Sequence, residues 1–389
     1  MKKFYFLLLV FLFSFQNIHS QKLQLSVYSE VSILTAGPGN ELFETFGHSA
    51  IHIKDPVLRI DYVFNYGLFT FNQPNFYTNF AKGKLLYRLG VQPYQSFVEN
   101  YKVDERWMKK QVLDLTQKEK QAFFQILMTN AKQENASYLY DPYFDNCATK
   151  LRDITKQVLG NQVTFDTSYS DQHLTLRQLM NIEMPWNTWG SFGINLALGS
   201  KLDKEATANE YMYLPDYVYL AFKNASTTTK PLVKKEVTLL NFEEKKLKTK
   251  WYNPMFVFSL LFLITIIVTY RDQKRSRRSK WLDFSLFFIS GIIGALIVFL
   301  WFFTDHSTTP NNFNFLWAFA PNLIVAFLLL KNDASKWVPN YIKVCLLLLL
   351  LLPLVWVLKF QLFSITIIPI LGALFVRYYF LMKLLPSKK

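Results

Sequence analysis

The stretch GHSAIHI at residues 47–53 places a histidine, His48, at the head of an apolar run that is typical of a β-strand. A second stretch, DNCATKL at residues 145–151, places Cys147 at the start of a run that is typical of an α-helix. A thiol and an imidazole supplied in this way can serve as nucleophile and base. The two stretches therefore predict a thiol site, with the base on a strand and the nucleophile on a helix.

The predicted helix explains why the thiol would be reactive. Its apolar side chains recur at helical spacing on one side, and Gly160 suits the C-terminal end. Cys147 then lies in the first turn, where the positive end of the helix favours the thiolate and lowers the pKa of the thiol. Because the thiolate is the attacking species, this position favours catalysis.

His48 needs a third polar group that holds the imidazole in one tautomer and orientation. Residues 49–53 and 60–66 are predicted to form a hairpin, which returns either Asp61 or Asn65 to the side of His48. A bulge would shift the pairing, so both candidates stay open. His52 has the same facing as His48 on an alternating strand and is the second candidate for the base.

The other segments of this half extend the same α+β pattern. Residues 116–119 have the spacing of a capping box, so a helix should start there. The Phe- and Asn-rich residues 70–82 are expected to form a loop that covers a cleft. Asp171, His173 and Arg177 are expected to lie on a polar helix face or to line the cleft. Further strands are predicted at residues 23–35, 85–89 and 111–115.

The N-terminus indicates export. A basic start is followed by an apolar run over residues 4–15 and a small residue, Ser20, which predicts a signal peptide over residues 1–20. Residues 21–250 would then form an exported domain. Cys147 and Cys345 cannot form a structural disulfide, because Cys345 lies in an apolar span. A lone thiol in an oxidising compartment is a liability unless it is used or deeply buried, so we expect Cys147 to be functional.

Residues 251–389 are almost wholly apolar and predict a transmembrane domain of about five helices. Residues 271–280 hold six Lys or Arg, whereas residues 304–312 hold none. With the first domain exported, five spans place every basic loop in the cytoplasm. The short gap at residues 359–362 would also allow a re-entrant hairpin. The predicted spans are residues 255–270, 281–303, 313–330, 341–358 and 363–382.

Composition excludes two further classes of function. The net charge is +15, but the basic residues do not form a stripe with interleaved aromatics, and many lie beside apolar spans. We therefore expect no nucleic-acid partner. Five scattered histidines and two separated cysteines have no metal-ligand spacing, so we expect no metal and no cofactor.

The exported loop at residues 304–312 contains Asp305 beside His306. The first interpretation of this pair is a polar turn between two spans. The alternative is a proton relay or a contact to a lipid headgroup, in which case the pair would face the exported active site.

Several motifs in this order are similar to a known family. A strand histidine that precedes a helix-capping Asn146 and Cys147 resembles the circularly permuted papain-like fold, which lecithin:retinol acyltransferase and NlpC/P60-like proteins share. The closer resemblance is to Bacteroidota proteins with an Lnb N-terminal periplasmic domain. The motifs that carry it are FGHSA at 46–50, NYGLF at 65–69, YFDNCA at 143–148, PW at 185–186, YLP at 213–215 and FTDH at 303–306.

This resemblance implies a membrane-bound lipoprotein N-acyltransferase of the bacterial inner membrane, with its catalytic domain in the periplasm. It implies that Cys147 attacks a lipid ester, that His48 moves the proton, and that Asp61 or Asn65 orients His48. The acyl donor would be a phospholipid or the glyceryl ester of a lipoprotein, and the acceptor a lipoprotein amine. Asn146, Asp305 and His306 are candidates for contacts with substrate. The permuted acyltransferase pattern has a second histidine after the first, and no histidine follows His48 at that distance.

Two other functions fit the same residues. The first is an envelope cysteine peptidase or amidase that cleaves cell-wall peptides. The second is a non-catalytic envelope module that binds lipid or protein, with the spans as its anchor. A transferase must keep water from its thioester, and residues 70–80 together with the Asp305–His306 loop are the candidates for that shield.

Overall fold

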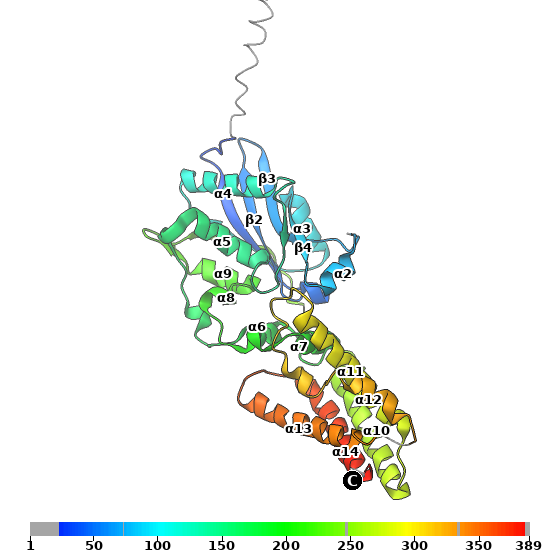
Figure 1. Cartoon of the computed structure of the whole chain (residues 1–389). Helices are drawn as coiled ribbons and strands as arrows, with labels where there is room; N and C mark the ends of the chain where they lie inside the picture. The colour runs from blue at the N-terminus through cyan, green and yellow to red at the C-terminus, as the bar shows by residue number, and fades with distance from the viewer. Residues whose placement is uncertain (1–22, 73, 246–247, 333–334, 386–389) are drawn as a thin grey trace, which may run out of the picture.

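A computed structural model describes residues 23–72, 74–245, 248–332 and 335–385. The predicted signal peptide at residues 1–20 lies outside the described residues. A sheet-containing domain comes first and a helical bundle follows (Figure 1). A small group of helices at residues 176–203, called the lobe below, lies between them. This arrangement confirms an α+β domain followed by a helical membrane domain. The last strand ends at Leu240 and the first long apolar helix begins at Pro254.

The exported domain is built on a seven-stranded antiparallel sheet in the order β6-β4-β3-β2-β1-β5-β9. A two-stranded sheet, β7 (Val163–Thr164) with β8 (Ser226–Thr227), lies outside it. The strands of the main sheet are β1 (Glu30–Ala36), β2 (His48–Asp55), β3 (Ile60–Leu68), β4 (Leu86–Pro93), β5 (Met108–Leu113), β6 (Ser137–Leu139) and β9 (Val233–Leu240).

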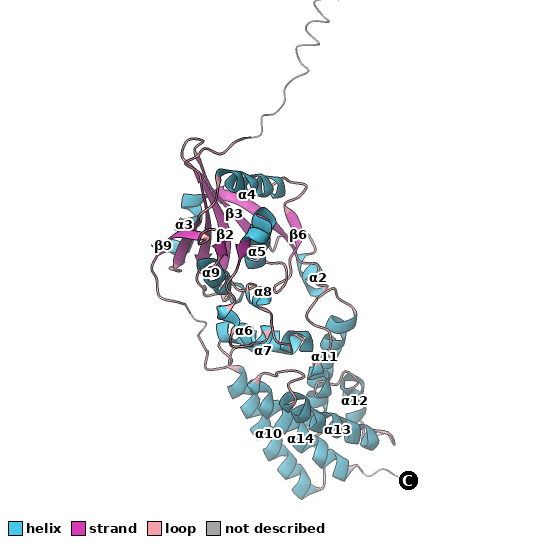
Figure 2. Ribbon diagram, turned by 90° about the vertical axis from the view of Figure 1, so that its left-hand side faces the viewer, coloured by secondary structure: helices cyan, strands magenta, loops and turns pink. Residues whose placement is uncertain are grey.

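Helices cover both faces of this sheet (Figure 2). Because side chains alternate along a strand, Ile51 and Ile53 of β2 point into the core under α4, α5 and α9, whereas Ala50 points toward α3. The helices of this half are α2 (Phe76–Ala81), α3 (Tyr94–Val103), α4 (Gln117–Asn130), α5 (Cys147–Leu159), α6 (Leu176–Glu183), α7 (Trp189–Ala197), α8 (Ala208–Tyr211) and α9 (Pro215–Lys223).

Local sequence signals located β1 to β5, α4 and α5. The capping box at Thr116 and Glu119 starts α4 as predicted. Two expectations were wrong. The first strand begins at Glu30 rather than at residue 23, because Asp55 accepts hydrogen bonds from the backbone and hydroxyl of Ser26 and holds the preceding segment outside the sheet. The expected loop at residues 70–82 contains a short helix, α2.

The membrane half follows the predicted apolar runs in four of five cases. Within the described residues, four helices are long and apolar enough to cross a membrane. They are α10 (Pro254–Arg275), α11 (Lys280–Phe302), α13 (Val338–Val357) and the segment Ile365–Leu384, which contains α14 (Ile368–Leu384). The last two are separate helices joined by a tight turn around Lys359, which has a φ of 59°.

The third predicted span, residues 313–330, is not one continuous helix. It consists of a 3₁₀ turn, η5 (Phe313–Leu316), an irregular stretch and the short helix α12 (Asn322–Leu329). Its start is tied to the exported lobe, because Asn312 Nδ2 donates to Leu196 O at 2.8 Å. Its end is tied to the basic loop, because Arg278 Nη1 donates to Leu329 O at 2.6 Å. The segment therefore runs between the two ends of the bundle.

Close packing and buried polar contacts explain how this broken segment is accommodated. Pro321 has no N–H to continue a helix. Gly294 of α11 lies against the break, where an added Cβ would be 2.1 Å from Ala318 O. Asn322, at the start of α12, donates to Ser290 Oγ at 2.9 Å. Irregular backbone at membrane depth is tolerated only where protein covers it in this way.

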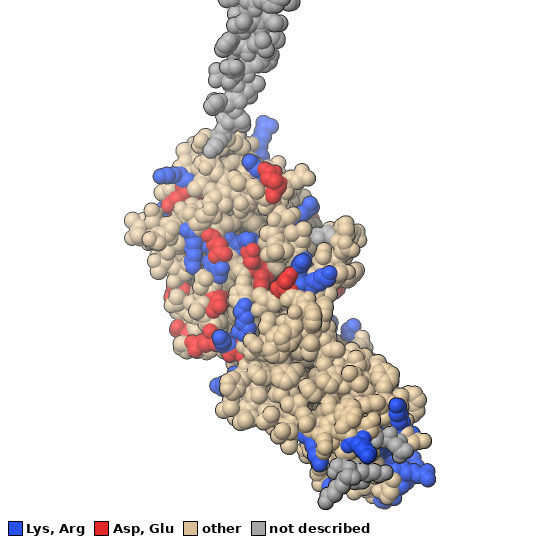
Figure 3. All heavy atoms as spheres, viewed as in Figure 1, with Lys and Arg blue, Asp and Glu red and all other residues tan. Residues whose placement is uncertain are grey.

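The basic side chains at the end of the bundle farthest from the sheet form one group, and acidic side chains are not seen among them in this view (Figure 3). The basic loop at residues 271–280 lies at this end, whereas the loop at residues 304–312 contacts the exported lobe. This distribution agrees with the positive-inside rule and with the orientation predicted from sequence.

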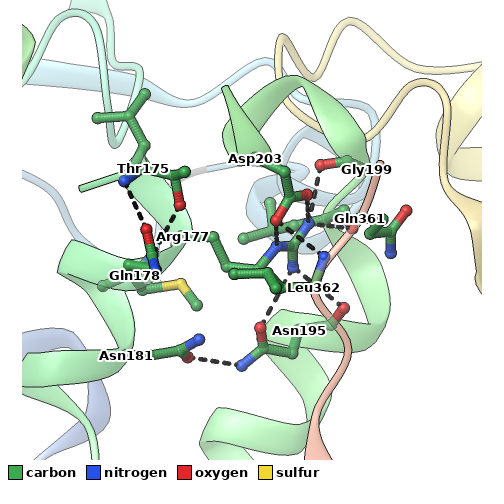
Figure 4. Close-up of polar contacts among 12 residues, drawn as sticks. Thr175, Arg177, Gln178, Asn181, Asn195, Gly199, Asp203, Gln361 and Leu362 are labelled. Carbon is green, nitrogen blue, oxygen red and sulfur yellow. Dashed lines mark hydrogen bonds and ion pairs between the residues drawn. The ribbon is translucent and has the colours of Figure 1, made fainter. Parts of the chain in front are cut away.

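Arg177 joins the exported lobe to the membrane bundle (Figure 4). Its guanidinium is fully buried and forms a two-pronged ion pair with Asp203 of η4 (Ser200–Asp203), with Nε–Oδ1 and Nη2–Oδ2 distances of 2.8 and 3.0 Å. Asp203 also accepts from the backbone N–H of Leu362, in the turn between α13 and α14, at 3.0 Å. Arg177 therefore lies in a buried junction and not on the polar helix face or in the cleft that the sequence suggested.

We predict that Arg177→Met lowers the free energy of unfolding by about 3–5 kcal/mol, because it leaves Asp203 buried without its partner. Thermal unfolding of the full chain in detergent measures this. The control is Lys223→Met, which breaks a more exposed pair with Glu236 and should cost about 1 kcal/mol or less. Adding Asp203→Leu should recover stability. If Arg177→Met unfolds like the control, the ion pair does not hold the junction.

Candidate active site

His48 is the first residue of β2, and the residue before it fixes where the strand begins. Gly47 has a φ of 72°, in the left-handed region that favours glycine, and a Cβ there would lie 2.7 Å from Ala36 O. The imidazole is partly buried and stacks on Tyr101 of α3, with ring centroids 6.5 Å apart. Tyr101 therefore supports one face of the imidazole, and part of the ring remains accessible to solvent.

The structure distinguishes between Asp61 and Asn65. His48 Nε2 donates to Asn65 Oδ1 at 2.6 Å, and Asn65 is buried. The regular β3–β4 pairing is interrupted between Asn65 and Leu68, so a bulge does affect this stretch. Asp61 is four residues away and contacts His52 instead, with its Oδ1 2.7 Å from Nε2. Asn65 is thus the group that orients His48.

His52 belongs to a separate pair. Its ring stacks on Tyr94 with centroids 4.2 Å apart, and it is held by Asp61. Burial and the nearby charge of Lys110 lower the pKa of His52 to about 4 despite the carboxylate. The neutral imidazole of His52 is bonded to Asp61 and does not contact the thiol of Cys147. His52, the second candidate for the base, is therefore not positioned to take the thiol proton.

The helix cap positions Cys147. Asn146 precedes α5, and its Oδ1 accepts from the backbone N–H groups of Ala148 and Thr149, both at 2.9 Å. Its Nδ2 donates to Pro142 O and Tyr213 O, both at 2.8 Å. Both polar atoms of the Asn146 side chain are thus engaged in hydrogen bonds to the backbone. Asn146, a candidate substrate contact from sequence, is a buried cap that orients the first turn.

The thiol and the imidazole meet at the junction of strand and helix. Burial alone would raise the pKa of Cys147, but the adjacent His48 and the backbone N–H groups of Ser49 and Ala148 hold that pKa below its usual value. Burial likewise opposes a charge on His48, and the Cys147 thiolate raises the pKa of the imidazole above its usual value. The geometry therefore favours a thiolate–imidazolium pair. Because Nε2 binds Asn65, Nδ1 is the nitrogen left for the thiol proton.

Aromatic side chains that the sequence interpretation missed surround this pair. Tyr140 and Cys147 both lie beside Gly67, because a Cβ at Gly67 would be 3.7 Å from both Tyr140 Cε2 and Cys147 Cβ. Gly67 has a φ of 90°. The alternation through Tyr138 and Tyr140 in the β6 region was the available signal, but only the fold brings that strand beside Cys147.

Asp305 and His306 lie elsewhere. The backbone N–H of Asp305 donates to Lys82 O at 2.8 Å, and the ring of His306 bonds to backbone groups of Phe80 and Ala81. The next residue, Ser307, donates to Asp141. This loop therefore docks on α2 and on the segment before Cys147, without touching the thiol or imidazole. Among the described residues, no group of three or more His, Cys, Asp or Glu could hold a metal ion.

Two family models match the chain. Residues 14–182 match the Lnb N-terminal periplasmic domain, and residues 245–389 match the Lnb transmembrane domain. The two matches cover the strand with His48, the helix with Cys147 and the whole membrane bundle. No curated protein and no solved structure shows a significant match.

We predict that Cys147 reacts with iodoacetamide down to lower pH than a free thiol does. The lowered pKa of Cys147 keeps thiolate present as the pH falls from about 8 to about 6, so the rate should fall by less than the roughly tenfold per unit of an ordinary thiol. In His48→Gln, burial is no longer offset, the pKa of Cys147 rises, and the steep dependence should return. Identical pH profiles for the two proteins would contradict the pairing.

Proposed function

Because the chain belongs to the Lnb family and is a membrane protein with an N-terminal periplasmic domain, we propose that it is a lipoprotein N-acyltransferase. It would move a fatty acyl chain through a thioester on Cys147 to the α-amine of a diacylglyceryl-cysteine. The observation that carries this proposal is the Cys147–His48–Asn65 arrangement, held on the exported side of a membrane bundle. The inner membrane is the proposed location, with the site in the periplasm.

The first half-reaction forms the thioester. His48 Nδ1 takes the thiol proton, and the thiolate attacks the carbonyl carbon of a lipid ester. The carbon–oxygen bond to the glyceryl group then breaks, and His48 returns the proton to the leaving alcohol oxygen. Asn65 keeps the imidazole in the tautomer that this transfer needs.

The backbone at the start of α5 supports the charged intermediate. Asn146 takes the N–H groups of Ala148 and Thr149, so the N–H of Cys147 is the first-turn donor that the cap leaves for the developing oxyanion. The helix dipole adds a positive potential at the same point.

The second half-reaction transfers the chain. The α-amine of the lipoprotein attacks the thioester carbonyl, His48 accepts a proton from the amine, and the carbon–sulfur bond breaks to give an amide and regenerate the thiolate. Atoms balance without a cofactor. A donor and an acceptor that both carry lipid chains explain why the thiol domain has a membrane bundle, which a peptidase acting on soluble peptides does not need.

Burial favours transfer over hydrolysis. Cys147 is 8% exposed, and the rings around it restrict the access of water to a thioester. The segment around α2 and the Asp305–His306 loop, both suggested as a shield from sequence, contact each other next to the segment that precedes Cys147. This placement supports a role in covering the site.

We predict that Cys147→Ala abolishes N-acylation and that Asn65→Ala lowers it by about 10- to 100-fold, because an unheld imidazole loses its orientation. Asp61→Ala is the matched control from the same strand and should stay within about twofold, since the side chain of Asp61 hydrogen-bonds His52 and not His48. The measurement is mass spectrometry of lipoprotein N-terminal peptides from a strain that lacks the activity and expresses each variant.

Two outcomes would overturn the proposal. Restored N-acylation by Cys147→Ala would exclude the thioester. Purified protein that releases free fatty acid, or cleaves cell-wall peptides, without acylating a lipopeptide amine would identify a hydrolase instead.

A further inference from the structure

A group of exposed aromatic side chains surrounds α2 on the exported domain. Phe43, Phe71, Tyr77 and Phe80 are 59%, 53%, 74% and 50% exposed. Phe69 and Phe76 link them, since both pack against Phe71, with ring centroids 5.2 and 5.1 Å away. Contiguous exposed apolar surface of this kind marks a site of interaction with a protein or a membrane. We call these six residues the aromatic patch.

The aromatic patch lies next to the loop that follows the candidate membrane span α11. The loop that follows α11 is bonded to the end of α2 through the backbone of Asp305 and Lys82. Gly83 lies against His306, where an added Cβ would be 2.5 Å from the backbone nitrogen. Figures 1 and 2 both place α2 next to the exported end of α11. Phe302 and Phe303 at that end are 65% and 69% exposed, so the end of the span near α2 also presents apolar side chains.

A continuous series of aromatic contacts leads from the aromatic patch to the thiol. Phe76 stacks on Phe69 with centroids 6.1 Å apart, and Phe69 contacts Tyr87 at 4.9 Å. Tyr87 contacts Tyr140 at 4.2 Å, and Tyr140 adjoins Cys147 across the space left by Gly67. This series of packed aromatic rings therefore connects the aromatic patch to the Cys147 sulfur.

Basic charge accompanies this path. A hollow of about 310 Å³ beside α2 is lined by Phe76, Phe80 and Leu86, and also by Lys84 and Arg88. Lys84 pairs with Asp305, with its Nζ 3.8 Å from Oδ2, whereas Arg88 is exposed and forms no ion pair among the residues that the structure describes. Apolar surface with adjacent cations matches the acyl chain and phosphate of a phospholipid, the combination found at membrane interfaces.

We propose that the aromatic patch inserts into the exported leaflet and admits the acyl chain of a phospholipid toward Cys147. This inference rests on the proposed function for the fate of the chain, but contact with lipid does not depend on that function. It identifies the acyl donor as a phospholipid of the leaflet, and it makes α2 the entrance through which the acyl chain passes toward Cys147. Interfacial burial of aromatic side chains would hold the entrance at the headgroup boundary.

The first test measures lipid contact. The variants Tyr77→Cys and Tyr28→Cys are each labelled with an environment-sensitive fluorophore. Both are full-length proteins in nanodiscs of phosphatidylethanolamine and phosphatidylglycerol. Tyr28 is 70% exposed and serves as the matched control. The parent chain gives the background from its two buried cysteines. Lipids with a nitroxide on the acyl chain should quench position 77 several-fold more than position 28. Equal quenching at the two positions overturns the proposal.

The second test measures passage of the chain. Phe71→Ser/Tyr77→Ser should lower kcat/KM for a vesicle-embedded phospholipid donor by about tenfold, while the iodoacetamide reaction of Cys147 stays unchanged. The control is Tyr28→Ser/Tyr62→Ser, which removes exposed tyrosines elsewhere on the domain. Unchanged kcat/KM in the first variant overturns the entrance. If the parent protein transfers no acyl chain at all, the proposed function fails, and the quenching result still decides lipid contact.

Discussion

The capping of α5 by Asn146 is the contact on which the site depends. This side chain satisfies two backbone N–H groups of the helix and two carbonyls from other segments, so the position of Cys147 is set by both the helix and the lobe below the sheet. The strand then delivers His48 to the same point. A thiol held there is near a helix N-terminus and a cationic partner, and these favour the thiolate although burial opposes it.

A second set of constraints couples this site to the membrane. Arg177 and Asp203 connect the lobe to the turn before α14, while the loop after α11 connects the bundle to α2 and to the segment before Cys147. The thiol domain is therefore seated on the bundle at several points and is not a separate body on a flexible linker.

Several features were predictable because local sequence determines them. Asn146 and Cys147 show a cap and a first turn, the capping box at Thr116 marks α4, and long apolar runs mark four of the membrane helices. Other features were not. The pairing of His48 with Asn65 and of His52 with Asp61 depends on strand register. The third apolar run contains Pro321 just before α12, but its apolar composition is typical of a continuous span, so the break was not predicted.

The sequence by itself determined an α+β domain, a membrane domain, and the thiol and imidazole that form the candidate site, since these follow from composition, period and helix-end signals. Only the tertiary structure decided which residue hydrogen-bonds His48, that the amide of Asn146 also bonds Tyr213 O, that Arg177 lies in a junction, and that aromatic side chains far apart in sequence line up between α2 and Cys147. The physical reason is that those relations are contacts between separate elements. Such contacts arise from how the strands and helices pack together, which no local pattern encodes.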